Sequence, residues 1–149
     1  MSIREELARV IARDPRYTIE GYAFVLESLN LARNRKLKAM SKRERARQTR
    51  SRKKAAAEAK PEISGHVTGR ELCLSARRLA VRLFGSMAVI VLDQWGIRAT
   101  SDIGDIVYNL IASGDLDKTP TDQRSDFDDV FDFATALRPK TLIKDENPQ

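Results

Sequence analysis

Apolar residues recur with a helical period in the first thirteen residues. Ser2 and Glu5 have the spacing of a capping box, in which a hydroxyl and a carboxylate satisfy free amides at a helix start. Asp14 precedes Pro15 and ends the pattern, because the residue before a proline avoids the helical conformation. We therefore predict a helix over residues 3–13 with a buried face formed by Ile3, Leu7, Val10 and Ile11.

A second helix is predicted after the turn at residues 14–17. Thr18 can cap its start, and the pattern continues to about Ala32 or beyond. Phe24 lies on the flank of an apolar stripe formed by Tyr22, Val25, Leu26 and Leu29.

The strongest local signal begins at Val67. Thr68 and Glu71 again have capping-box spacing, and Val67 and Leu72 have the spacing of a hydrophobic staple. Gly85 can end this helix in a left-handed conformation. Its predicted buried stripe is Leu72, Ala76, Leu79, Ala80 and Leu83.

Residues 86–95 are compatible with a short buried strand as well as with a helix. Ser86 can cap a helix here, and Gly96 stands where a glycine ends one. We interpret the segment as a helix because the three- and four-residue spacing is met by Ala88, Val91, Leu92 and Trp95.

The cleanest amphipathic pattern follows Thr100 and Ser101, either of which can cap a further helix that ends at Gly114. Its stripe consists of Ile103, Ile106, Val107, Leu110 and Ile111. Together these segments predict an all-α fold, a small orthogonal domain of about five to six helices.

The 149 residues are enough for one core. We expect residues 1–32 to form an N-terminal helical pair that packs on this core, and residues 66–137 to form the main helical domain. Residues 33–65 are expected to be a basic arm, and residues 138–149 a loose tail.

Charge divides the chain unevenly. Residues 33–60 contain thirteen Lys or Arg and two Glu, a net charge of +11, so the other residues carry −5 of the total of +6. Residues 100–133 contain nine Asp against Lys118 and Arg124, a net charge of −7. The basic run has only Leu37 and Met40 as sizeable apolar side chains. We therefore expect it to be either a solvated extension of the second helix or an arm that orders on a partner.

The basic run indicates binding to the backbone of RNA or DNA, because Lys and Arg neutralise phosphates and release counterions. No aromatic residue interleaves with it, so a base-stacking platform is not indicated. A solvated linker, or a clamp onto the Asp-rich region, is the alternative that needs no ligand. The residues that we expect to contact phosphates are Arg43, Arg45, Arg47, Arg50, Arg52, Lys53 and Lys54.

A protein–protein adaptor is the alternative function. Its interface would be the acidic-aromatic C-terminal region, with Phe127, Asp128, Phe131 and Phe133. The simpler interpretation of these three phenylalanines is that they are core residues. A helix-turn-helix over residues 87–113 is disfavoured, because Asp102 and Asp105 would bring like charge to the phosphates.

Little in the sequence indicates catalysis. His66 is the only histidine and Cys73 the only cysteine, so we expect a structural hydrogen bond for the first and burial for the second. The Asp residues between 122 and 132 lack the glycine and glutamate of a calcium loop. We expect a protein that is not an enzyme and uses no cofactor or metal.

Without a long apolar run or a secretory leader, we also expect a cytoplasmic location and no membrane contact.

Five short motifs stand out along the chain: Asp14-Pro15-Arg16-Tyr17, His66-Val67-Thr68-Gly69 with Glu71-Leu72, Phe84-Gly85-Ser86-Met87-Ala88, Trp95-Gly96-Ile97 and Asp102-Ile103-Gly104-Asp105-Ile106-Val107. They resemble the motifs of an uncharacterised family of short bacterial proteins from planctomycete-type genomes. The resemblance covers most of the chain outside the basic run, and it implies an identity but no activity. The basic run is longer than the corresponding connection in that family.

Overall fold

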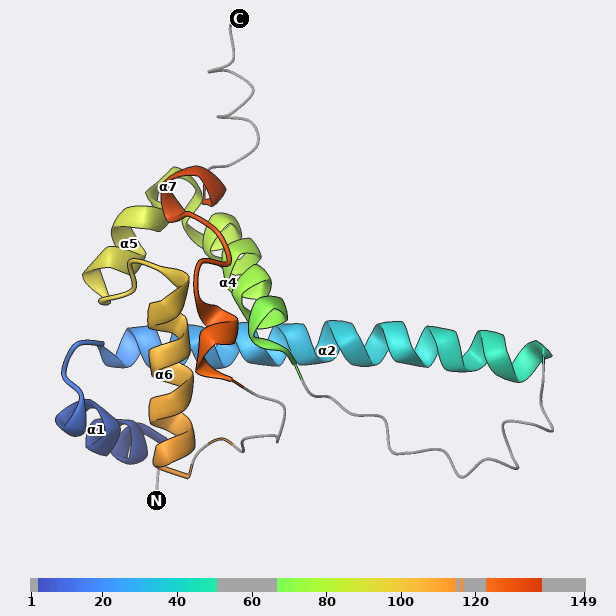
Figure 1. The fold of residues 1–149 in the computed structure, drawn as a ribbon, viewed down its shortest axis with the longest axis horizontal. Coiled ribbons are helices and arrows are strands. Elements are labelled where there is room, and N and C mark those ends of the chain that lie inside the picture. Colours follow the sequence, from blue (N-terminus) through green and yellow to red (C-terminus); the bar gives the residue numbers. More distant parts are fainter. Residues whose placement is uncertain (1–2, 51–66, 115, 117–122, 138–149) are drawn as a thin grey trace, which may run out of the picture.

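The computed structural model describes residues 3–50, 67–114, 116 and 123–137, and within these ranges it contains helices and no strand (Figure 1). The predicted all-α class is confirmed. None of the described helices is both long and apolar enough to cross a bilayer. The elements are α1 (Ile3–Arg13), α2 (Ile19–Arg50), α4 (Gly69–Phe84), η1 (Gly85–Met87), α5 (Ala88–Gln94), α6 (Thr100–Ala112), η2 (Arg124–Phe127) and α7 (Phe133–Ala136).

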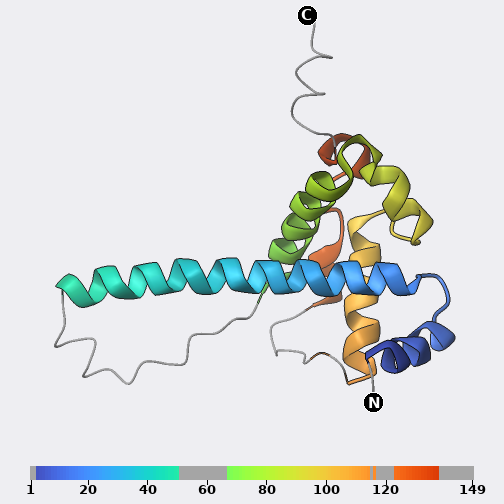
Figure 2. The same ribbon diagram turned by 180° about the vertical axis from the view of Figure 1, so that it is seen from behind.

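The core lies where α4 and α6 pack on the N-terminal half of α2. Both views show the other described helices gathered around this half (Figures 1 and 2). Burial of apolar surface at this junction is the main driving force for the fold. Side chains that are at most 3% exposed come from all three helices and include Tyr22, Val25, Leu72, Leu79, Ile103, Ile106 and Leu110.

Local capping chemistry sets the start of α4 as predicted. The Thr68 hydroxyl accepts a hydrogen bond from the Glu71 amide at 3.1 Å, and the Glu71 carboxylate accepts one from the Thr68 amide at 2.9 Å. Gly85 follows the last residue with a φ of +54°. Cys73 in this helix is fully buried, as predicted, and burial raises the pKa of its thiol to about 12.

Two predicted caps are wrong. Residues 85–87 form a 3-10 turn, so α5 begins at Ala88 and Ser86 does not cap it. At α6, Thr100 is only 1% exposed, and its hydroxyl accepts a hydrogen bond from the Val130 amide at 3.1 Å. Asp102 satisfies the start of α6 instead, by accepting hydrogen bonds from the amides that precede it.

The turn between α1 and α2 is tied to α6 by polar contacts. The Tyr17 hydroxyl lies 2.8 Å from a carboxylate oxygen of Asp102 and of Asp105, and burial raises its pKa. The guanidinium of Arg16 donates to Asp14 at 2.7 and 2.8 Å and holds the pKa of that carboxyl well below its usual range. The acidic start of α6 is thus occupied by contacts within the molecule.

α2 runs without interruption through the expected boundary between residues 32 and 33. Ala, Arg, Lys, Gln and Glu are all good helix formers, so the change from an apolar to a charged composition does not end the helix. The expectation of a helical extension is therefore confirmed as far as Arg50. The remainder of the arm, the expected tail at 138–149 and His66 lie outside the described residues.

Candidate nucleic-acid interface

The basic half of α2 projects away from the other described helices (Figures 1 and 2). Its eighteen residues, 33–50, extend over about 27 Å at the usual helical rise. None of the side chains described at residues 33–43 is buried. The charged side chains described at residues 33–43 therefore remain accessible to solvent.

Four of the seven residues that the sequence indicated lie on this half of α2. Arg43 is exposed, and positions 45, 47 and 50 lie on the same helix. Positions 43, 47 and 50 follow a four- and three-residue spacing and share one face, whereas position 45 falls on the opposite side. Arg52, Lys53 and Lys54 lie outside the described residues.

α4 fixes the position of the base of this extension. The Ser75 hydroxyl donates a hydrogen bond to the Ser28 carbonyl at 2.7 Å. Two turns further along α2, the ammonium of Lys36 lies 3.0 Å from the carboxylate of Glu71. Burial acts to raise the pKa of Glu71, but the Thr68 amide and Lys36 outweigh this effect, and the pKa lies below its ordinary value. Glu71 thus links the cap of α4 to the basic half of α2.

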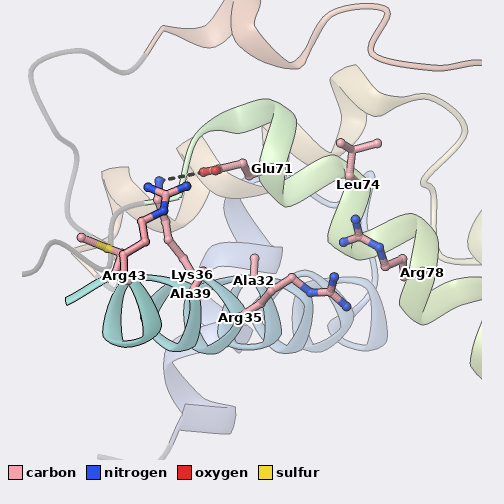
Figure 3. Close-up of a pocket in the computed structure, with 9 residues that line it drawn as sticks. Ala32, Arg35, Lys36, Ala39, Arg43, Glu71, Leu74 and Arg78 are labelled. Carbon is pink, nitrogen blue, oxygen red and sulfur yellow. Dashed lines mark hydrogen bonds and ion pairs between the residues drawn. The ribbon is translucent and has the colours of Figure 1, made fainter. Parts of the chain in front are cut away.

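A groove of about 410 Å³, the α2–α4 groove, lies along this junction (Figure 3). Its size is within the usual range of ligand sites. Its apolar lining consists of Ala32, Ala39, Met40 and Leu74. Its charged lining consists of Arg35, Lys36, Arg43, Glu71 and Arg78.

A second groove of about 610 Å³ adjoins the first and shares Arg35 and Arg78 with it. It adds Lys38 from α2 and Arg82 from α4. Among the residues that the structure describes, neither Arg35 nor Arg78 forms an ion pair or a side-chain hydrogen bond. The sequence interpretation did not include the arginines of α4 in a site. Their four-residue spacing, at positions 78 and 82, was the signal that they share a face.

The structure separates the residues of the alternative protein–protein interface, because one is in the core and others line a groove. Phe127 is 5% exposed and packs against Gly69 and Gly104, so it belongs to the core and is not available to a partner. Phe133 is 6% exposed and stacks on the half-buried Phe131 at 5.7 Å. These two rings and the exposed Asp128 line a groove of about 510 Å³, with Arg98, Asp129 and Asp132 at its rim.

Comparisons with known proteins give no relative: no family model, curated protein or solved structure matches the chain. The described part of the chain contains no group of three or more His, Cys, Asp or Glu residues that could hold a metal ion.

Proposed function

We propose that the protein binds the phosphate backbone of RNA or DNA through the C-terminal half of α2 and the basic residues that follow it. The observation that carries this proposal is the continuation of α2 as one helix through residues 33–50, with no buried side chain among those described at residues 33–43. A row of Lys and Arg on one helix neutralises successive phosphates and releases their counterions.

The helical form of the arm favours binding, because a preordered segment loses less conformational entropy in a complex. We also propose that the protein is located in the cytoplasm, where nucleic acid is accessible, and that it is related to the bacterial family that its motifs resemble. That relationship adds no activity.

The test is fluorescence anisotropy of labelled single-stranded RNA and duplex DNA at several salt concentrations. A chain with Arg43→Gln and Arg50→Gln should bind more weakly than the unmodified chain. The slope of log affinity against log salt should fall by about 0.7 to 0.9 for each lost phosphate contact.

A chain with Arg13→Gln and Arg98→Gln is the matched control, since it loses the same charge from exposed positions on α1 and beside α6. It should keep most of the affinity and of the salt slope. Equal losses in the two variants would mean that net charge alone attracts the nucleic acid. Absence of binding by the unmodified chain would overturn the proposal and favour the adaptor, for which the groove beside Phe131 is the remaining surface.

A further inference from the structure

Positive charge from two helices converges on the α2–α4 groove and its neighbour. The two grooves together are lined by one acidic side chain, Glu71, and by six basic ones: Arg35, Lys36, Lys38, Arg43, Arg78 and Arg82. Glu71 is already paired with Lys36. Figure 3 shows Arg35 from α2 and Arg78 from α4 in the space between the helices. Like charges held together repel each other, and a bound anion relieves that repulsion.

The groove and the arm lie on one continuous face of α2. Lys36, Met40 and Arg43 line the groove, and the same four- and three-residue spacing continues to positions 47 and 50. A nucleic-acid strand that follows this face of the arm toward the domain therefore reaches the groove. Its phosphates would then meet Arg78, which the folded domain supplies.

Apolar side chains distinguish this groove from a site that binds phosphate alone. Met40 and Leu74 are half-buried and line the groove together with the arginines, so a weakly polar group has apolar contacts there. In a duplex the bases are stacked and paired, whereas a single strand can turn a base out onto apolar side chains and guanidinium planes.

We infer that the α2–α4 groove holds one unstacked base of a single-stranded nucleic acid, with the flanking phosphates on Arg35 and Arg78. This inference rests on the proposed function and adds a substrate class to it. The base contacts the apolar lining of the groove, and the strand continues along the arm. RNA and DNA share the chemistry that the groove recognises.

The test compares four labelled nucleic acids of about ten nucleotides in length. They are oligouridylate, oligothymidylate, an RNA duplex and an abasic single strand. The unmodified chain should bind both single strands more tightly than the duplex and the abasic strand, and the two single strands distinguish RNA from DNA as the source. Arg78→Gln should lower the salt slope for single strands by about 0.7. Arg13→Gln is the matched control, because this exposed arginine lies on α1 and lines neither groove, and it should change the slope much less.

Two apolar variants test the base itself. Met40→Ala and Leu74→Ala should each weaken oligouridylate binding about fivefold, since each removes part of an apolar contact. Binding of the abasic strand should not change. Met40 lies in the projecting half of α2, so its substitution leaves the core intact.

The outcomes separate the two proposals. If substitutions in the arm weaken binding while Arg78→Gln, Met40→Ala and Leu74→Ala do not, the groove inference fails and the proposed function stands. Equal affinity for the duplex and the single strands also overturns the inference. A third contrary result would be that a labelled peptide of alternating Glu and Leu binds more tightly than oligouridylate and displaces it. If no strand binds, both proposals fail.

Discussion

The two halves of α2 form one helix but are stabilised in different ways. Residues 19–32 place Tyr22 and Val25 in the core with no exposed surface, whereas no side chain described at residues 33–43 is buried. The first half is held by tertiary packing, in which each buried apolar side chain contributes about 1.5 to 3 kcal/mol. The second half depends on helix propensity, which differs by at most about 0.7 kcal/mol among ordinary residues.

This difference shows that a continuous helix can cross the edge of a domain. The packed half provides the fixed end that an isolated helix lacks, because initiation is the costly step of helix formation and elongation is not. The projecting half can therefore carry a charge density that a core could not tolerate. Substitutions in the two halves should have correspondingly different effects.

The largest contrast is expected from truncating Phe24. Its ring is 5% exposed and lies 5.8 Å from the Trp95 ring. Phe24→Ala should lower the free energy of unfolding by about 4 kcal/mol, through lost burial and the cavity left behind. Lys38→Ala, on the exposed half, should change it by less than about 0.5 kcal/mol. Urea unfolding followed by circular dichroism measures both, and similar midpoints for the two variants would contradict the division of α2.

A slightly smaller effect is expected at Gly96, which supports the start of α2. Its φ is +92°, and an added Cβ would lie 2.2 Å from the backbone oxygen of Arg16. Gly96→Ala should therefore cost about 3 kcal/mol from strain and displaced backbone. Gly85→Ala is the control, because its φ is also positive but no atom lies within 4 Å of the added Cβ. Gly85→Ala should lower the free energy of unfolding by about 1 kcal/mol. An equally small loss for Gly96→Ala would show that the backbone moves aside at little energetic cost.

Much of the helical framework was predictable because it depends on local chemistry. The bounds of α1 follow from its apolar spacing and from Pro15, and the start of α4 follows from Thr68 and Glu71. The caps at Ser86 and Thr100 were predicted incorrectly, because local sequence does not determine these two helix starts. The burial of Thr100 beneath Val130 is a tertiary effect that no local pattern contains.

The helical form of residues 33–50 was one of the two forms that the composition of the basic run allowed, whereas the α2–α4 groove was not predictable. The groove exists because Ser28 and Lys36 of α2 contact Ser75 and Glu71 of α4, and this crossing joins residues about forty positions apart. Phe127 shows the same limit, since the sequence left open whether its ring lies in the core or at an interface, and only the structure shows that Gly69 and Gly104 make room for it in the core.

Acid should weaken the contacts that hold the start of α2. The pKa of Asp14 is depressed in the folded state, so its carboxylate contributes stability above the unfolded value of about 4. That contribution is lost as the pH falls below about 4 toward the depressed folded value. Asp14→Asn should cost about 1 kcal/mol at neutral pH and make the loss of stability below pH 4 shallower. Urea midpoints between neutral pH and pH 2 measure this, and an unchanged acid dependence would assign it to other carboxylates.

The smallest effect on stability is expected from a helix-breaking substitution in the projecting half. Ala46→Pro removes a backbone hydrogen bond and should disrupt α2 beyond residue 42, which lowers the helical signal in far-ultraviolet circular dichroism. The free energy of unfolding of the domain should remain within about 0.5 kcal/mol, because the projecting half has no buried side chain among those described at residues 33–43. Trp95 provides the measurement, since this single tryptophan contacts Phe24 and Phe84 and its fluorescence reports on the core.

Ala32→Pro, at a position only 8% exposed, is the control and should lower the free energy of unfolding by about 3 kcal/mol or more. If Ala46→Pro shifted the Trp95 transition as far as Ala32→Pro, the two halves of α2 would unfold as one cooperative unit.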